Sequence, residues 1–299
     1  MTGSLSRVLE TQVFQSHTRQ PYPTLLSLHG YQILIAFFVF IAASWIAFYR
    51  LAPKMIRYHK RNKSKDDQVT RLKWGHMTAS LLHAVIASAW SAYLWYDGSL
   101  GISAEARMWG YTKPLGHMLS FSLGYFMWDV CCCLWHIKIY GGGFLTHALL
   151  GLIGLATAFI PFMMYPASRF LLFEVSTIFI NIHWFLENLG YGGSILMIIN
   201  DGIVLLAYLL VRLILGSFFT YEFMHDLWEL QSSLPMALCI ISIVANFVTH
   251  LLNFYWFYRL CQSAVRMANR RFKISEQKFT ASAQKRRLMN ASDEKTKAL

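Results

Sequence analysis

Charged residues are scarce in this sequence of 299 residues: only 14% are Asp, Glu, Lys or Arg, whereas 56% are hydrophobic. A soluble globular domain carries about 25% charged residues, so the composition excludes an ordinary soluble fold. The apolar residues stand in blocks of about 20, the length that a helix needs to cross a bilayer. The sequence therefore predicts an all-α, polytopic membrane helical bundle.

Cysteine is also rare, and four of the five cysteines lie inside apolar blocks rather than in loops. This distribution excludes the disulfide framework of a small secreted protein. Cys131, Cys132 and Cys133 are consecutive and would point in three directions on a helix, so they cannot form a CxxC metal pair. We expect neither a metal site nor a cofactor. Residues 1–23 lack the apolar core of a signal peptide, so the first span is expected to direct the chain to the membrane.

Seven apolar blocks predict about seven transmembrane helices, an N-terminal span followed by a six-helix core. Lipid leaves no alternative to helix, because every backbone N–H and C=O group must be bonded internally. The fifth block is short and follows Tyr165 and Pro166 closely, so the fourth and fifth blocks could instead form one re-entrant hairpin. The predicted spans are 25–49, 75–96, 114–135, 147–165, 169–186, 195–219 and 234–258.

The net charge of +12 comes from basic residues that cluster beside apolar blocks. Nine of the 27 Lys and Arg lie in residues 50–73, and eleven lie from Arg259 onward. This placement is typical of cytosolic juxtamembrane segments and not of a nucleic-acid-binding surface. The predicted division is a lumenal segment 1–24, the first span with a basic cytosolic loop 25–70, a core domain 71–271 and a basic cytosolic tail 272–299.

The tail contains a candidate retrieval signal. Its last helix is expected to continue to about residue 278, and the polar end beyond it is predicted to lack regular structure. Lys295 and Lys297 stand fifth and third from the end, the pattern of a dilysine signal that a vesicle coat reads in the cytosol. This pattern predicts residence in the endoplasmic reticulum membrane, with the C-terminus in the cytosol and a vesicle coat as a partner.

Polar side chains repeat at helical spacing within the predicted spans, where a charge at mid-bilayer costs at least ~2.5 kcal/mol. Such residues must face one another or a cavity. Interhelical hydrogen bonding is the preferred alternative for Tyr125, Asn181, Asn246 and Asn253. The residues expected to line a lipid-sized cavity are Tyr125, Asp129, His147, Glu174, Thr177, Asn181, His183, Asp201 and His250.

Two further expectations concern the ionisable residues. His147 is a candidate general base, with Asp129 or Asp201 as the carboxylate that orients it. Asp201 and Arg212 lie near opposite ends of the sixth span, and we expect both to extend partly toward the membrane interface. No ring of charged residues, glycine-signature filter or inverted repeat supports a channel or a transporter.

The order of these features resembles the TLC-domain family, which includes the ceramide synthases and several relatives without synthase activity. The resemblance covers about residues 71–271 and is closest to the small orphan TLC-domain proteins. It implies an endoplasmic reticulum protein whose helical bundle encloses a lipid-sized cavity. The most specific segments are Ser122-Leu-Gly-Tyr125-Phe-Met-Trp-Asp129, Phe144-Leu-Thr-His147 and Arg169-Phe-Leu-Leu-Phe-Glu174-Val-Ser176-Thr177-Ile-Phe-Ile-Asn181-Ile-His183-Trp184.

Two departures separate the chain from the synthases that it resembles. The synthases have a histidine pair and two aspartates three apart, whereas here Ala148 follows His147 and Val204 stands three residues after Asp201. We therefore expect a protein that binds membrane lipids and influences lipid composition, with little or no catalysis. The alternatives are a lipid acyltransferase that uses His147 as base, and a cargo adaptor that cycles between the endoplasmic reticulum and the Golgi.

Overall fold

In the computed structural model, every regular element of the described chain is helical, as the sequence predicts. The structure describes residues 23–58, 68–97, 103–159 and 163–297. The predicted lumenal segment 1–24 thus lies almost entirely outside the described residues. The elements are α2 (Pro23–Ile46), η1 (Ala47–Leu51), α3 (Ala52–Tyr58), α4 (Gln68–Asp97), α5 (Ala104–Trp109), α6 (Lys113–Trp135), α7 (Ile137–Tyr140), α8 (Gly142–Ala158), α9 (Met164–Phe170), η2 (Leu171–Phe173), α10 (Glu174–Asn188), α11 (Ile195–Tyr208), η3 (Leu209–Ile214), α12 (Leu215–Glu229) and α13 (Met236–Lys297).

Six helical segments of the described chain are long and apolar enough to cross a membrane, which confirms the polytopic helical bundle. They are Leu25–Ile56, Gln68–Asp97, Lys113–Trp135, Met164–Asn188, Ile195–Glu229 and Met236–Asn269. A shorter apolar helix, Gly142–Ala158, lies between the third and the fourth of them. Its 17 residues span about 26 Å, somewhat less than a hydrocarbon core of about 30 Å.

The short member of the set is therefore the fourth predicted span, and the expectation that the fifth is short is wrong. The chain leaves α8 after Ala158, before the expected turn at Tyr165 and Pro166. Pro166 instead lies in the first turn of α9, where its missing N–H removes no helical hydrogen bond. From there α9, η2 and α10 run on as 25 helical residues.

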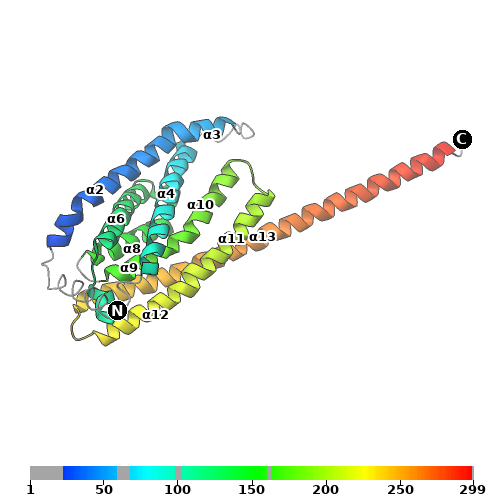
Figure 1. The fold of residues 1–299 in the computed structure, drawn as a ribbon. Helices are drawn as coiled ribbons and strands as arrows, with labels where there is room; N and C mark the ends of the chain where they lie inside the picture. Colours follow the sequence, from blue (N-terminus) through cyan, green and yellow to red (C-terminus); the bar gives the residue numbers. More distant parts are fainter. Residues whose placement is uncertain (1–22, 59–67, 98–102, 160–162, 298–299) are drawn as a thin grey trace, which may run out of the picture. The chain divides into compact units, whose positions relative to one another are not determined.

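Close helix contacts hold the core of the bundle together. α6 packs beside α2 and α8, and α10 packs beside α4 and α11 (Figure 1). At Gly124 on α6 an added Cβ would come within 2.6 Å of the Ile33 carbonyl oxygen on α2, so the two backbones are in contact. Phe40 on α2 is fully buried beside Tyr125, with ring centroids 5.1 Å apart. Small residues at such crossings allow helices to approach closely inside a membrane.

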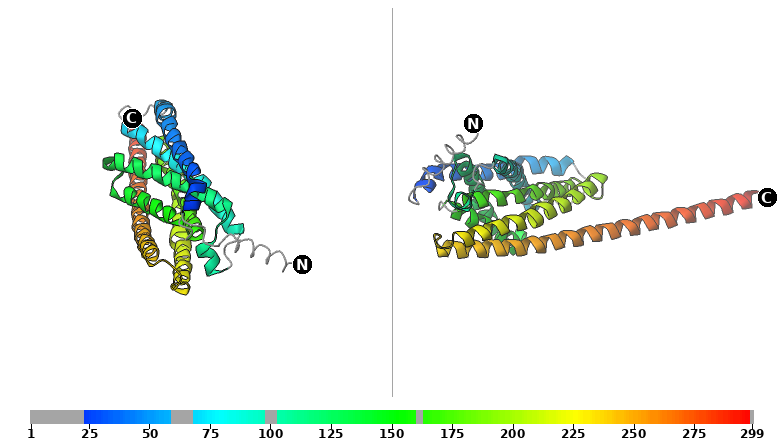
Figure 2. Two further views of the ribbon diagram at one scale, coloured as in Figure 1. Left: turned by 90° about the vertical axis from the view of Figure 1, so that its left-hand side faces the viewer. Right: turned by 60° about the horizontal axis from the view of Figure 1, so that its bottom comes forward.

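Three segments, α11, η3 and α12, follow one another as a single helical rod (Figures 1 and 2). The π-helical segment η3 interrupts this rod at its middle. A second π-helical segment, η1, lies at the end of α2. π-helical turns inside longer helices are rare and often occur at functional sites.

The chain divides into two compact units after Phe254. The first unit holds the bundle and the beginning of α13, and the second is the remainder of α13. The helix continues to Lys297, so the prediction that the part beyond residue 278 lacks regular structure is wrong. Three alanines, three lysines and two arginines lie in residues 279–297, and all three residue types have a high intrinsic helix propensity. Lys295 and Lys297 lie in the last turn, where only the backbone is described.

Candidate functional site

A cavity lies inside the first unit, between α6, α8, α9, α10, η3, α12 and the first turns of α13. It has a volume of about 160 Å³ and lies in a wider cleft that is open to the surroundings of the bundle. Most of its wall is apolar, and Phe126, Leu150, Leu155, Phe170, Leu171 and Phe223 contribute to it. Seven polar residues also reach the wall, namely His147, Thr157, Glu174, Arg212, Ser242, Asn246 and Thr249.

The backbone is irregular at three places around this cavity. Met163 has φ 68° and is the one described residue other than glycine with a positive φ. Its N–H donates to the Met108 carbonyl oxygen over 2.6 Å, which holds the chain at the turn into α9. The 3₁₀ segment η2 directly precedes Glu174, and the π segment η3 contains Arg212. Both charged residues of the wall thus lie in or directly after a segment where the regular α-helical hydrogen-bond pattern is broken.

Arg212 is buried inside the bundle, with 7% of its surface exposed. Its Nε donates to Ser176 Oγ over 2.8 Å, and its Nη2 donates to Thr177 Oγ1 over 3.0 Å. Its Nη1 donates to Asn253 Oδ1 on α13 over 3.3 Å. The guanidinium carbon also lies 5.2 Å from the centre of the Tyr208 ring. The expectation that Arg212 extends toward the membrane interface is therefore wrong, because these three neutral oxygens hold it inside.

Glu174 shares the cavity wall with Arg212 and is 5% exposed. Its Oε2 lies 3.9 Å from Nδ1 of His83 on α4. His83 is fully buried and stacks on Tyr125, with ring centroids 3.9 Å apart and planes within 5°. The other ring nitrogen of His83 lies 3.2 Å from Ser122 Oγ. Glu174 is thus connected to α4 and α6 through one buried histidine.

His147 also reaches the cavity wall, where its ring packs edge-on to Phe126 with centroids 6.0 Å apart. In the described part of the chain it forms no hydrogen bond to Asp129 or to Asp201. Asp129 lies 3.3 Å from His76 Nε2, and Asp201 lies 2.5 Å from His183 Nδ1. The structure therefore does not support the expected pairing of His147 with a carboxylate, since each aspartate contacts a different histidine.

The remaining residues expected in the cavity lie at contacts around it. Asn181 Nδ2 donates to Ser80 Oγ on α4 over 3.0 Å. His250 on α13 lies 3.4 Å from the Thr220 hydroxyl on α12. Of the nine residues predicted to line the cavity, His147 and Glu174 reach its wall, and Thr177, Tyr125 and the others contact neighbouring helices.

Sequence reasoning missed three of the buried polar residues that surround the site. His76, Ser80 and His83 lie on α4 at intervals of four and three, which places them on one helix face. This interval is the signal that could have identified them. Together they contact Asp129, Asn181 and Glu174, so α4 supplies the partners of the acidic and amide groups on α6 and α10.

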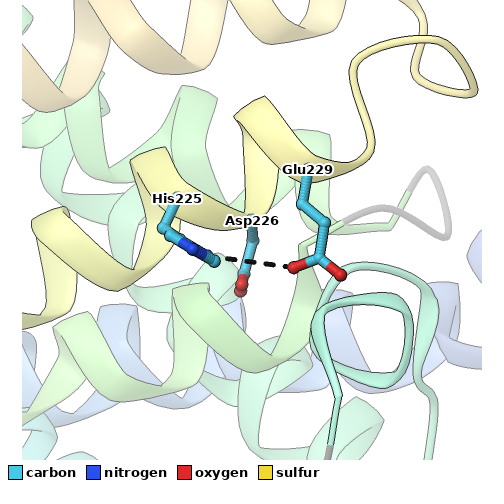
Figure 3. Close-up of side chains that lie close together, drawn as sticks. All are labelled: His225, Asp226 and Glu229. Atoms are coloured by element: carbon cyan, nitrogen blue, oxygen red, sulfur yellow. Dashed lines mark ion pairs between the residues drawn. The ribbon is translucent and has the colours of Figure 1, made fainter.

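His225, Asp226 and Glu229 on α12 lie close enough together to suggest a metal site (Figure 3). Arg107 on α5 donates two hydrogen bonds to the Asp226 carboxylate, from Nη2 to Oδ1 over 2.5 Å and from Nε to Oδ2 over 2.7 Å. The hydrogen bond to Asp226 raises the pKa of Arg107. His225 and Glu229 are exposed and lie 3.8 Å apart. The cluster is therefore an ion pair between Arg107 on α5 and Asp226 on α12, with two exposed polar side chains beside it.

These observations describe a multi-pass helical membrane protein with an internal, mostly apolar cavity. Comparison with known proteins agrees with this description. Residues 73–262 match the model of the TLC domain, and the chain belongs to the TLC-domain family. The resemblance to small TLC-domain proteins rather than to ceramide synthases is confirmed by the curated relatives that the chain matches.

Three relatives illustrate this similarity. An uncharacterized TLC domain-containing protein of Schizosaccharomyces pombe is 26% identical, with coverage of 80% of this chain and 81% of the relative. Topoisomerase I damage affected protein 4 of Saccharomyces cerevisiae is also 26% identical, over 86% of this chain and 92% of the relative. TLC domain-containing protein 4-B of Danio rerio is 24% identical, over 67% and 76% respectively.

Proposed function

We propose that this protein binds a membrane lipid in the cavity between α6, α8, α9 and α13 and thereby influences membrane lipid composition. The observation that carries the proposal is a mostly apolar cavity with charged residues on its wall, inside a bundle of membrane helices. The cavity of about 160 Å³ is smaller than the ~300–1,000 Å³ typical of whole-ligand sites, so it would hold part of an acyl chain and leave the rest in the open cleft beside it.

The rim of the cavity suits entry from the membrane. Ile153 on α8 and Ile241 on α13 both line the cavity and are 42% and 43% exposed. Side chains of this kind at the outer surface of a membrane bundle face lipid. The proposed entry path for an acyl chain therefore runs between α8 and α13, and burial of the chain against the apolar wall would stabilise the complex.

A cavity-filling substitution tests the proposal. Gly154 lines the cavity, and a Cβ added there meets nothing within 4 Å. Gly154→Leu should therefore fill the cavity and reduce the amount of lipid that co-purifies with the protein, as measured by mass spectrometry. Gly202→Leu on α11 is the matched control, because its Cβ also meets nothing within 4 Å and Gly202 lies outside the cavity. Equal lipid content in both variants would contradict the proposal.

The effect on lipid composition needs a cellular measurement. Deletion of the gene should change the lipidome, and wild-type protein should restore it whereas Gly154→Leu should not. An unchanged profile of sphingolipids and glycerophospholipids after deletion would count against the proposed influence on composition.

The basic tail supports a proposed location in the endoplasmic reticulum membrane with a cytosolic C-terminus. The support is the pattern of Lys295 and Lys297 and the placement of basic residues beside the spans. Replacement of both lysines by serine should move the protein to later compartments, as seen by fluorescence microscopy. An unchanged distribution would remove the support for a retrieval signal.

A second candidate function is acyl transfer with His147 as the general base. One observation favours it: the His147 ring lies on the cavity wall and, among the described residues, forms no hydrogen bond. Protein in nanodiscs, supplied with an acyl-coenzyme A and a long-chain amine or lysolipid, would show turnover that His147→Ala abolishes. Turnover that persists in His147→Ala would exclude this site as the catalytic one.

A further inference from the structure

Arg212 is the buried cation whose position the lipid-binding proposal does not explain. It stands at the midpoint of the helical rod Ile195–Glu229, 17 residues from either end. At roughly 1.5 Å per residue, this is about 26 Å from each end of the rod. A charge buried inside a bundle of membrane helices is costly, and ionisable residues inside spans usually mark functional sites.

The protein supplies Arg212 with neutral partners. Its donors contact the oxygens of Ser176, Thr177 and Asn253, none of which carries a charge. Within the described ranges Arg212 forms no ion pair with a carboxylate. Glu174 lies on the same wall and attracts the guanidinium, but its carboxylate is placed beside His83. The hydroxyl and amide oxygens therefore fix the direction of the guanidinium without neutralising it.

A second observation also indicates a ligand. Ser242 on α13 lines the cavity, is 8% exposed, and has a buried hydroxyl without a hydrogen-bond partner. Ser242, Asn246 and Thr249 lie at intervals of four and three and so present one polar stripe to the cavity. Native proteins rarely bury such a hydroxyl without a partner, so a bound molecule that supplies one would stabilise the site.

We propose that the ligand of this cavity is an amphiphile with a negatively charged head, a carboxylate or a phosphate, that binds Arg212. This inference rests on the proposed lipid binding and names the class of lipid. Arginine presents its donors in a planar fork that matches both of these anions. The chain of the amphiphile lies against Phe126, Leu155 and Leu171, and the head offers its oxygens to Arg212.

The two opposite charges on the cavity wall predict opposite effects of their removal on the binding of an anionic ligand. An anionic head neutralises Arg212 and is repelled by Glu174, which lies on the same wall. Loss of the Arg212 charge should therefore weaken binding, whereas loss of the Glu174 charge should strengthen it. A purely structural role for the two residues would not give opposite effects, because loss of a buried polar contact destabilises the protein in both cases.

The test measures the affinity of purified protein for three probes that share an 18-carbon chain: oleate, 1-oleoyl lysophosphatidate and oleyl alcohol. At least one anionic probe should bind about ten-fold or more tightly than the alcohol, as expected for hydrogen bonds to a charged group. Arg212→Gln should remove this preference, Arg212→Lys should restore most of it, and Glu174→Gln should increase it. Arg259→Gln is the matched control, because Arg259 is exposed on α13 and outside the cavity.

Melting temperatures of all variants in detergent identify any that do not fold, and the Arg212→Lys and Glu174→Gln pair then still decides the question. Binding of oleate alone identifies a carboxylate, and binding of lysophosphatidate alone identifies a phosphate. Equal affinity for the alcohol and both anions would overturn the inference and leave lipid binding intact. If none of the three probes binds and no lipid co-purifies, the proposed function fails as well.

Discussion

Replacement of Gly124 by alanine should push α2 away from α6. A Cβ at this position would lie 2.6 Å from both the Ala36 Cβ and the Ile33 carbonyl oxygen, and 2.8 Å from the Phe37 nitrogen. Two of these three atoms belong to the backbone of α2 and cannot move without the helix. Since ordinary contacts begin near 3.4 Å, the helices must separate by about 0.8 Å at the crossing.

The cost of this separation can be estimated. Overpacking of a well-packed core costs about 1–3 kcal/mol, and the contact with backbone places Gly124→Ala in the upper half of that range. Alanine gains up to about 1 kcal/mol over glycine in helix propensity, so a net loss of about 1–2 kcal/mol is expected. Unfolding by a denaturing detergent, followed by tryptophan fluorescence, would measure it.

A control separates the clash from the change in propensity. At Gly202 on α11 an added Cβ meets nothing within 4 Å, so Gly202→Ala should be neutral or stabilising. The double variant with Ala36→Gly should recover only part of the loss, because the contact with the α2 backbone remains. If Gly124→Ala proved as stable as Gly202→Ala, the close crossing of α2 and α6 would be refuted.

Two further substitutions compare a buried ion pair with a partly exposed one. Asp226→Asn leaves Arg107, whose side chain is 14% exposed, without its counter-charge and should cost about 3 kcal/mol of unfolding free energy. An unfolding midpoint equal to that of the wild type would contradict this pair. Asp201→Asn should cost less than about 1 kcal/mol, because the side chains of His183 and Asp201 are 33% and 18% exposed. A loss as large as that of Asp226→Asn would show that this second pair is shielded from solvent.

The spans followed from the sequence because apolar blocks of sufficient length have one stable form in lipid. Their ends did not, and the turn before α9 is an example. Pro166 looks like a helix breaker in the sequence, yet the first turn of a helix accepts proline, so the chain turns earlier, at Met163.

The candidate site was predicted only in part, because spacing along a helix identifies a polar face without its partner. Glu174 and His147 were expected in the cavity and reach its wall. Asp129 was one of two carboxylates predicted to orient His147, but the side chain that faces it is His76, which lies 53 residues before Asp129 in the chain. Only the packing of α4 against α6 brings those two residues together, and no local pattern specifies that packing.

Arg212 was misplaced for a different reason. Its position was judged from its distance along the sequence to the predicted end of the sixth span, which made it look terminal. In the structure α11 and α12 form one rod of 35 residues, and the same arginine stands at its centre. The rod ends ten residues beyond the predicted end of the span, and the arginine that looked terminal is buried inside the bundle.

The π segment η3 also determines the orientation of α12 about the axis of the helical rod. A π turn holds one residue more than a regular turn, so the face of α12 is rotated by about 100° from the continuation of α11. Without the extra residue, Asp226 would point away from Arg107, and Phe223 would leave the cavity wall. One additional residue in the chain therefore sets the phase of two distant contacts at once, which makes the length of this helix as important as its composition.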